Sequence, residues 1–330
     1  MTMEARAHHL AALAGLAVQE VCPLSTESRN AIARVRLSDG RSAVLKTYDA
    51  QGDPHWANRF RREEKVLALL ATAKPAVAPK GIAGYVGETG PAALLMEDVG
   101  SNCLADELLR AGSTRLWNEA ADYLCSLHEE MRRQRTPLHR TAMAISLDRI
   151  NGPVSVNRFR IAAKRITGAE PDAALARAFR AAIAPLLTAP KAMIHNSMSP
   201  LNVVLGPNGW RAIDWETLTW ATPVWDWAEL LRSPYNPLPF AAAEAITADA
   251  MKDRKAEGLY RLAVLSRHMD SLATVVLRRR RYEAEGRADR AAEYARRAIF
   301  YVGDLHDVLA RLRLPEQLED GIAAVAASAL

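Results

Sequence analysis

Residues 194–202 read Ile-His-Asn-Ser-Met-Ser-Pro-Leu-Asn, and residues 213–216 read Ile-Asp-Trp-Glu. Between these stretches, two short apolar runs at 202–205 and 210–213 flank Gly206-Pro207-Asn208-Gly209. Glycine, proline and asparagine favour tight turns, so the pattern predicts a short β-hairpin. The surrounding segments are rich in Ala, Leu and Arg, and their pattern predicts helices. A histidine, an asparagine and an aspartate are therefore grouped around one hairpin in a mostly helical region.

The N-terminal part of the chain has a different pattern. Two strand-like runs at 31–37 and 42–48 flank Ser38-Asp39-Gly40-Arg41, and an Asp-Gly pair in this setting predicts a hairpin. A helical run at 54–73 follows, and then come short apolar runs at 82–86 and 92–96. We therefore expect an α+β protein with two lobes. A small N-lobe with an antiparallel sheet would occupy residues 1–97, and a larger, mostly helical C-lobe residues 98–330.

The helix predicted at 54–73 carries a carboxylate on its apolar face. This face is formed by Phe60, Val66, Leu67 and Leu70. Glu63 lies in the middle of the face, where a carboxylate is costly unless a cation meets it. Lys46 ends the apolar run Ala43-Val44-Leu45 and is the natural partner, since a lysine at this place would enter the lobe. The alternative is that Glu63 is a half-exposed helix residue, and the sequence alone leaves both interpretations open.

Together these motifs resemble the aminoglycoside phosphotransferase and choline kinase superfamily, which has a protein-kinase-like fold. The catalytic loop of that family reads His-x-Asp-x-x-x-x-Asn, and a short hairpin and Ile-Asp follow. His195, Asn202 and Asp214 match this pattern, whereas Ser197 stands in place of the catalytic aspartate. Weaker matches are Leu95-Met96-Glu97-Asp98, Tyr123-Leu124-Cys125-Ser126-Leu127-His128 and Pro223-Val224-Trp225-Asp226-Trp227-Ala228. The resemblance spans about residues 20–235, and its specificity lies in the order of the pieces.

The resemblance implies an enzyme that uses ATP and magnesium to phosphorylate the hydroxyl of a small molecule. Lys46 would contact phosphates and Glu63 would orient it, as in kinases. Asn202 and Asp214 would supply the oxygen ligands that magnesium prefers. The segment joining the lobes would place Glu97 and Val99 at the nucleotide. In the family, the residues at positions His195 and Asp226 brace the catalytic loop, and we assign neither a chemical step.

Two departures from the family pattern affect the expected activity. The loop that covers the nucleotide usually contains glycine, but here residues 24–30 read Leu-Ser-Thr-Glu-Ser-Arg-Asn, so Ser25 and Ser28 would contact phosphates instead. At the catalytic position, Ser197 has no charge at neutral pH and a shorter reach than an aspartate. A serine would act there only through a bridging water. We therefore expect transfer to be impaired while nucleotide and metal binding persist.

Two classes of function remain compatible with the sequence. The first is a phosphotransferase scaffold with impaired transfer, acting on a choline-, aminoglycoside- or sugar-like alcohol. The second is a kinase-like pseudoenzyme, or a repurposed nucleotide-binding protein, that phosphorylates no small molecule. Lys46, Glu63, Asn202 and Asp214 are all retained, which favours continued use of the nucleotide site.

The acceptor is less well defined by the sequence. His195-Asn196 and the aromatic-Glu pair after Asp214 resemble the choline, ethanolamine and thiamine kinase branch. The aromatic residues near the loop are either a partial cage for a quaternary ammonium or packing between helices; they are Trp215, Trp220, Trp225, Trp227 and Tyr235. The segment 133–191 is basic, so a neutral or anionic alcohol is also compatible with the sequence as the acceptor.

Composition and charge exclude several other classes. The chain has 330 residues, of which 49% are hydrophobic, and it has no apolar run of the roughly 18 residues that a membrane span needs. Its start predicts a helix, since it lacks the pattern of a signal peptide. Three widely spaced cysteines predict reduced, buried thiols in the cytoplasm. Eight arginines in residues 278–297 alternate with acidic residues, so we expect the surface of a helix; nucleic acid is an unlikely partner.

Overall fold

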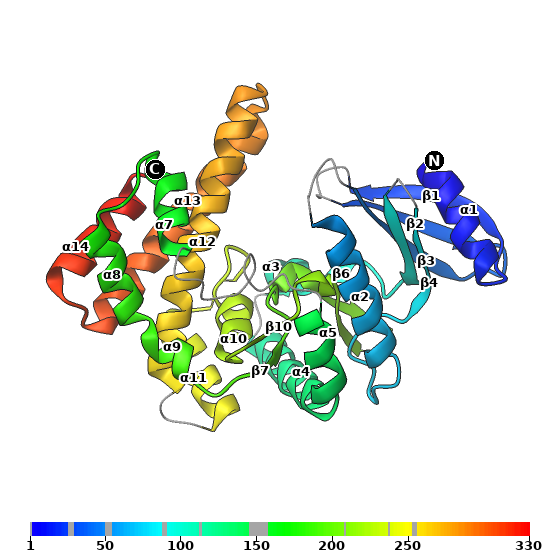
Figure 1. Ribbon diagram of the computed structural model, residues 1–330, viewed down its shortest axis with the longest axis horizontal. Helices are drawn as coiled ribbons and strands as arrows, with labels where there is room; N and C mark the ends of the chain where they lie inside the picture. The colour runs from blue at the N-terminus through cyan, green and yellow to red at the C-terminus, as the bar shows by residue number, and fades with distance from the viewer. Residues whose placement is uncertain are drawn as a thin grey trace. The chain divides into compact units, whose positions relative to one another are not determined.

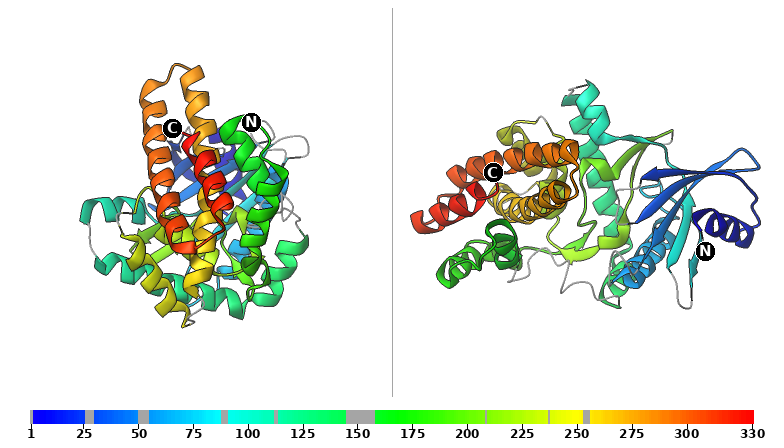
Figure 2. Two further views of the ribbon diagram at one scale, coloured as in Figure 1. Left: turned by 90° about the vertical axis from the view of Figure 1, so that its left-hand side faces the viewer. Right: turned by 90° about the horizontal axis from the view of Figure 1, so that it is seen from above.

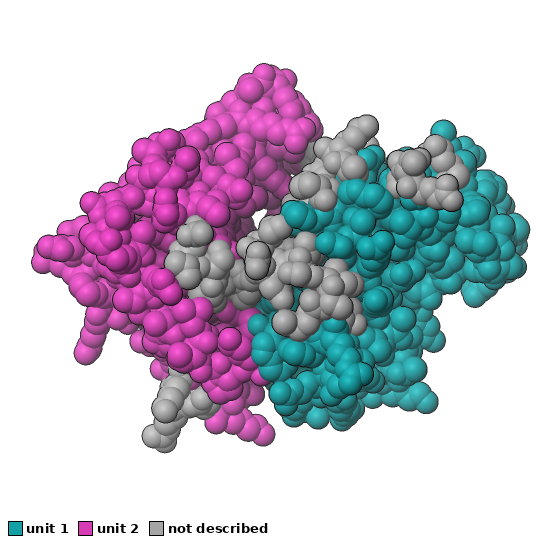
Figure 3. All heavy atoms as spheres, viewed as in Figure 1, with its two compact units in different colours: residues 1–107, 123–151, 193–220 teal, residues 108–122, 152–192, 221–330 magenta. Residues whose placement is uncertain are grey.

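A computed structural model describes residues 2–25, 30–49, 55–87, 91–111, 114–144, 158–207, 209–236, 238–252 and 256–330. The chain has the expected α+β class, with an antiparallel N-terminal sheet and a larger helical C-terminal part (Figure 1). It divides into two compact units, which Figure 3 colours separately. Unit 1 contains residues 1–107, 123–151 and 193–220, and unit 2 contains the remaining residues. The lobe boundary at residue 97 is a different division, and it stays a prediction.

The N-terminal sheet contains the predicted hairpin at the predicted residues. Its five antiparallel strands run in the order β1-β2-β3-β5-β4. Their bounds are β1 Val18–Ser25, β2 Ala31–Leu37, β3 Ser42–Tyr48, β4 Gly81–Val86 and β5 Ala92–Glu97. Gly40 has a φ of 84° in the turn between β2 and β3, a conformation that glycine adopts without strain.

Strand alternation sends successive side chains of the sheet to opposite faces. Helix α1 (Met3–Leu13) covers one face, and Leu10 packs there in a core with Val35 of β2 and Leu45 of β3. Since side chains alternate along a strand, Lys46 points to the other face. Helix α2 (Trp56–Leu70) packs against strands β3, β4 and β5 (Figure 1). The alternation of side chains along β3 thus places Lys46 on the side of the sheet where α2 lies.

The middle of the chain contains short strands and turns, including the second hairpin, together with helices. They are β6 Asn102–Cys103, α3 Leu104–Ala111, α4 Thr114–Arg133, α5 Arg135–Ala144, β7 Ala192–Ile194, the 3-10 turn η1 Pro200–Asn202, β8 Val203–Gly206, β9 Gly209–Ala212, the 3-10 turn η2 Trp215–Thr217 and β10 Thr219–Ala221. Strands β8 and β9 pair as the predicted hairpin, with β6 as a third strand. The backbone N–H of Ile213 donates to the carbonyl of Asn202 (2.9 Å), so the hairpin closes beside the aspartate that follows it.

The remaining elements are helices. They are α7 Arg158–Thr167, α8 Ala173–Ala182, α9 Ala184–Thr188, α10 Val224–Leu231, α11 Phe240–Met251, α12 Ala256–Ala284, α13 Ala288–Leu312 and α14 Glu316–Ala327. Helices α12 and α13 lie side by side as a long helical hairpin (Figure 2). None of the helices in the described ranges is long and apolar enough to cross a membrane.

The arginine-rich segment 278–297 corrects one expectation. It is the end of α12 and the start of α13 with a turn between them, because Gly286 breaks the helix with a φ of 68°. Several arginines have structural partners. Arg280 donates to the carbonyls of Arg165 and Ile166 at the end of α7, and Arg279 donates to the carbonyl of Ala329. Cations at helix C-termini are favourable, so these arginines stabilise the packing of unit 2.

The expectation of buried cysteines is wrong. Cys22 and Cys125 are exposed and Cys103 is partly exposed, and none of these three cysteines is in a disulfide bond. Cys22 lies on β1, a strand at the edge of the sheet, and Cys125 lies between Leu124 and Ser126 on the solvent side of α4. Whether a cysteine is buried depends on whether its face of the helix or strand is covered by other elements, and the sequence did not reveal which faces are covered.

The segment that follows β5 is fixed to the sheet by Asp98. Its carboxylate accepts hydrogen bonds from Arg34 Nε (2.7 Å), Ser42 Oγ (2.7 Å) and the N–H of Gly100 (3.0 Å). Burial would raise the pKa of Asp98, but these hydrogen bonds outweigh it and lower the pKa below its ordinary value of 3.8. The folded state therefore favours the ionised carboxylate.

We expect Asp98→Asn to lower the free energy of unfolding at pH 7 by about 1 kcal/mol, the size expected of a part-exposed ion pair with hydrogen bonds. Because the folded pKa is lowered, this contribution is present above pH 3.8 and is lost as the pH falls through the folded pKa. Urea unfolding at pH 7 and at lower pH measures it, with the exposed Asp320→Asn as control. A difference between wild type and Asp98→Asn that does not shrink in acid would contradict this account.

Candidate functional site

Lys46 is the centre of the candidate site. Strand β3 carries it into unit 1, where its side chain is 6% exposed. Its Nζ lies 2.6 Å from Glu63 Oε2, 2.5 Å from Asp214 Oδ1 and 3.2 Å from Glu216 Oε2. Burial would lower the pKa of Lys46, but the three carboxylates, Asp214 first, raise it well above its ordinary value. Lys46 is therefore a cation at neutral pH.

Glu63 of α2 lies opposite Lys46, as the helix periodicity predicted. It is 1% exposed on the same face as Phe60 and Leu67. Its Oε2 accepts hydrogen bonds from Lys46 and from the hydroxyl of Tyr48, and its Oε1 accepts the N–H of Trp215 (3.2 Å). Burial raises the pKa of Glu63, and Lys46 offsets only part of that rise. A carboxylate with three donors is held in one orientation, so Glu63 fixes the position of the lysine.

Asp214 lies directly after the β8–β9 hairpin in a left-handed backbone conformation, with a φ of 67°. Asparagine and aspartate adopt this conformation more readily than most residues. Burial would raise the pKa of Asp214, but Lys46 outweighs it and the net pKa lies below the ordinary value. An ionised carboxylate is the kind of hard oxygen ligand that divalent cations prefer, so Asp214 could hold one.

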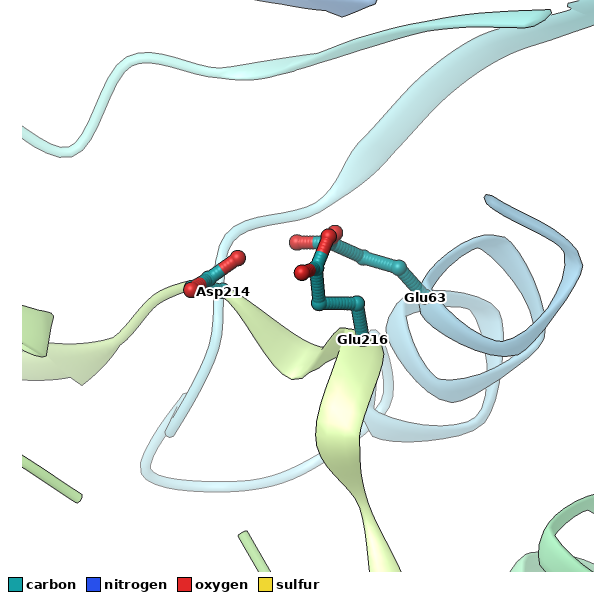
Figure 4. A group of neighbouring side chains, drawn as sticks. All are labelled: Glu63, Asp214 and Glu216. Atoms are coloured by element: carbon teal, nitrogen blue, oxygen red, sulfur yellow. The ribbon is translucent and has the colours of Figure 1, made fainter. Parts of the chain in front are cut away.

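Glu216 is a site residue to which the sequence reasoning assigned no role. The carboxylates of Glu63, Asp214 and Glu216 converge, with ligand oxygens within 4.8 Å of one another (Figure 4). Glu216 is 8% exposed and accepts hydrogen bonds from Asn30 Nδ2 (2.9 Å) and Arg59 (3.1 Å). The available signal was its spacing, two residues after Asp214, which places both carboxylates on one short turn.

The loop before the hairpin brings Ser197 and Asn202 together. Asn202 Nδ2 donates to the carbonyl of Ser197 (2.8 Å) and to its Oγ (3.1 Å). Since the amide nitrogen is engaged with Ser197, Oδ1 is the Asn202 atom left to act as a metal ligand. The N–H of Ile213 donates to the carbonyl of Asn202, so Asn202 lies opposite the residue that precedes Asp214.

His195 holds this loop and is fully buried. The N–H of Ser197 donates to its Nδ1 (3.3 Å), so the proton lies on Nε2, which donates to the carbonyl of Ile213 (2.9 Å). Both ring nitrogens are therefore used by the backbone. His195 joins the loop to the strand end that precedes Asp214, and no nitrogen remains for a proton-transfer step.

The other candidate residues lie as follows. Ser28 falls outside the described residues, and Ser25 is described only as the last residue of β1. Glu97 ends β5 and its Oε2 accepts the N–H of Lys80 (3.1 Å), while Val99 is 8% exposed. Asp226 is fully buried in α10 of unit 2. Roles for these residues in nucleotide binding or loop bracing stay predictions.

The aromatic residues near the loop have packing roles. Trp215, Trp225 and Trp227 are at most 1% exposed. The guanidinium of Arg135 lies over the ring of Trp220, 5.1 Å from its centroid, and Arg297 lies 5.2 Å from that of Tyr235. Rings that are buried, or stacked on an arginine, do not form an open cage for a quaternary ammonium.

Three basic side chains of helix α7, within the segment 133–191, have acidic partners. Arg158 donates to Asp270 (2.6 Å). Arg160 and Lys164 both form ion pairs with Glu170, at 3.2 and 3.0 Å. These pairs lower the net charge that a substrate would meet. The basic composition of the segment therefore gives little support to an anionic acceptor.

A family model described as the phosphotransferase enzyme family matches residues 20–265. Among solved structures, a choline/ethanolamine kinase family protein from Mesorhizobium loti is 16% identical, over 99% of this chain and 100% of that one, with a TM-score of 0.57. A GDP complex of aminoglycoside 2'-phosphotransferase-IIIa is 14% identical, over 88% of this chain and 94% of that one, with a TM-score of 0.57.

A third structure is an amicoumacin kinase in complex with AMP-PNP and Ca2+. It is 13% identical, over 91% of this chain and 95% of that one, with a TM-score of 0.57. A search of curated proteins with the sequence finds no match. At these identities, the likeness to the solved structures concerns the fold.

The three carboxylates around Lys46 lead to a prediction on stability. We expect Lys46→Met to lower the free energy of unfolding by about 3 kcal/mol, because removing one partner of a buried ion pair leaves its charges uncompensated. Magnesium should restore part of the loss, since a divalent cation can take the place of the ammonium. Thermal unfolding with and without MgCl2 measures both effects. The exposed Lys65→Met on helix α2 is the control, and a Lys46→Met protein that magnesium does not stabilise would contradict a metal site here.

Proposed function

Because the chain belongs to the phosphotransferase enzyme family, we propose that it binds ATP with magnesium at Lys46 and is a scaffold for phosphorylating the hydroxyl of a small molecule. The observation that carries the proposal is Lys46 held within 3.2 Å of three carboxylates, two of which follow the β8–β9 hairpin on one short turn. Phosphoryl transfer depends mostly on positioning and on neutralising phosphate charge, and this arrangement suits both tasks.

Each residue has a defined task in this proposal. Lys46 contacts the phosphates, and Glu63 keeps its ammonium in place through a bond of 2.6 Å. Asp214 and Glu216 of the carboxylate cluster, together with Asn202, would offer oxygen ligands to the metal. When bound, the divalent cation neutralises charge on the phosphates. The nucleotide complexes among the structural relatives, with GDP in one and with AMP-PNP and Ca2+ in another, support this use of the fold.

Ser197 limits the transfer step in the same proposal. Its hydroxyl lies 3.1 Å from Asn202 Nδ2, beside a metal ligand and where the family has a carboxylate. A neutral hydroxyl accepts a proton far more weakly than a carboxylate, so the acceptor alcohol is neither oriented nor activated as in an ordinary kinase. Hydrolysis of ATP by water depends less on this group and can continue slowly.

The same observation favours a second candidate function. A chain that keeps Lys46, Glu63 and Asp214 but has Ser197 at the catalytic position would also serve as a nucleotide-responsive binding protein without transfer. The two functions agree on nucleotide binding and differ in whether any alcohol is phosphorylated. Restoring the carboxylate therefore separates them.

We expect the protein to bind ATP with magnesium, and Lys46→Ala to weaken that binding about tenfold or more, because a buried cation facing the phosphates is lost. Calorimetric titration of ATP in the presence of MgCl2 measures both affinities. Lys65→Ala, an exposed change on α2, should bind as the wild type does. The absence of heat and of a thermal shift at millimolar nucleotide would contradict the proposal, and so would an unchanged affinity in Lys46→Ala.

We expect Ser197→Asp to raise the rate of transfer to an alcohol by roughly 10²- to 10⁴-fold, the usual contribution of a positioned base. The carboxylate would accept the Asn202 amide bond that the serine accepts now. The assay follows phosphorylated product by mass spectrometry over choline-like, sugar and aminoglycoside alcohols.

Ser199→Asp is the matched control for this assay. Ser199 lies in the same loop, and its Oγ accepts the N–H of Leu201, a task that aspartate also performs. A Ser197→Asp protein that binds ATP but phosphorylates no acceptor would favour the binding protein. Ordinary kinase rates in the wild type would show that the missing carboxylate is not limiting.

A further inference from the structure

Arg59 is a buried cation that lies beside the candidate site and that no motif predicts. It lies on α2, one helical turn before Glu63, and its side chain is 7% exposed. Its NH1 donates to Glu216 Oε1 at 3.1 Å. A buried guanidinium is costly unless it is paired, so this contact is part of what allows Arg59 to occupy the interior of unit 1.

Glu216 is shared among three donors. Arg59 takes Oε1, while Asn30 Nδ2 (2.9 Å) and Lys46 Nζ (3.2 Å) approach Oε2. Both oxygens of a candidate metal ligand are thus engaged by protein groups. A cation that binds at Glu216 has to compete with them.

The formal charges of the cluster decide how strong that competition is. Glu63, Asp214 and Glu216 carry −3, and Lys46 and Arg59 carry +2, which leaves −1 in total. A divalent cation that binds without a nucleotide is attracted only by this small net charge. The ammonium of Lys46 already contacts Asp214 and Glu216, the carboxylates that the cation would use. The cluster is therefore a poor site for a metal that arrives alone.

Lys46 and Arg59 differ in how readily they can leave. A lysine has a flexible stem, and a polyphosphate offers its ammonium a new partner. Helix α2, which carries Arg59, is fixed to the segment after Asp214 by two further bonds: Arg62 NH1 donates to the carbonyl of Leu218 (2.7 Å) and Trp215 N–H to Glu63 (3.2 Å). When Lys46 turns from Asp214 and Glu216 to a nucleotide, it keeps its contact with Glu63. Asp214 and Glu216 then carry −2 with Arg59 beside them as the remaining cation of the cluster, and the phosphates lie close by.

We propose that Arg59 is a positioning residue that holds Glu216 and makes the metal site depend on the nucleotide: a divalent cation binds weakly by itself and strongly together with a nucleoside triphosphate. This inference rests on the proposed function for the nucleotide half of the claim. Its metal half concerns only the carboxylate cluster and can be tested without nucleotide.

The test measures Mn2+ binding from the electron paramagnetic resonance signal of the free ion, in the absence and presence of AMP-PNP. We expect Arg59→Gln to bind Mn2+ alone about tenfold more tightly than the wild type, because one cation is removed beside the ligands. In the presence of AMP-PNP, its affinity for the nucleotide with Mn2+ should fall severalfold, because the phosphates lose a nearby positive charge. Arg59→Lys, which keeps the charge, should resemble the wild type without nucleotide.

Mn2+ affinity that rises without AMP-PNP and falls with it distinguishes a positioning role of Arg59 from a loss of structure. A loss of structure would lower the affinity in both measurements. Arg61→Gln removes an exposed arginine from the same helix and should change neither affinity. Arg59→Met, which replaces the arginine by an unbranched neutral side chain, gives the same comparison if Arg59→Gln does not fold. Mn2+ affinity without nucleotide that is unchanged or lower in the neutral variants would overturn the proposal. A wild type that binds no nucleotide would overturn the proposed function, and the metal-only arm would still decide the role of Arg59.

Discussion

Lys46 is a buried ammonium, and the arrangement of the candidate site depends on how its charge is compensated. Burial penalises a cation, so three carboxylates have to approach it, and they come from two parts of the fold. Glu63 requires helix α2 to pack on the face of the sheet opposite α1. Asp214 and Glu216 require the β8–β9 hairpin to end beside that helix. The ion cluster thus links the sheet, the helix and the hairpin of unit 1.

The same cluster explains why the site is built for exchange of partners. Asp214 and Glu216 hold Lys46 in the structure, yet carboxylates at this spacing are also suited to a divalent cation. Glu63 differs, because Tyr48 and the backbone of Trp215 fix it in addition to Lys46. One carboxylate therefore keeps the lysine in place, while the other two are available for a metal once phosphates compete for the ammonium.

Local patterns made much of this predictable. The hairpin of β2 and β3 was predicted at its observed residues because strand alternation and the Asp-Gly turn are short-range signals. Glu63 was found because a carboxylate on an apolar helix face needs a partner. Glu216, Arg59 and Asn30 were missed because their contacts join residues 157 and 186 positions apart, which only the tertiary fold brings together. The prediction that the cysteines are buried was wrong for the same reason, since their exposure depends on which faces other elements cover.

The central claim is that the carboxylate cluster around Lys46 is a site for a nucleotide with a metal. A crystal structure of the protein with AMP-PNP and Mg2+ tests it most directly. The account predicts that Lys46 leaves Asp214 for the phosphates, and that the metal is bound by Asn202, Asp214 and Glu216. It also predicts that Glu63 keeps its bonds to Lys46 and Trp215. A nucleotide bound elsewhere, or a Lys46 that still contacts Asp214 with no metal beside it, would contradict the account.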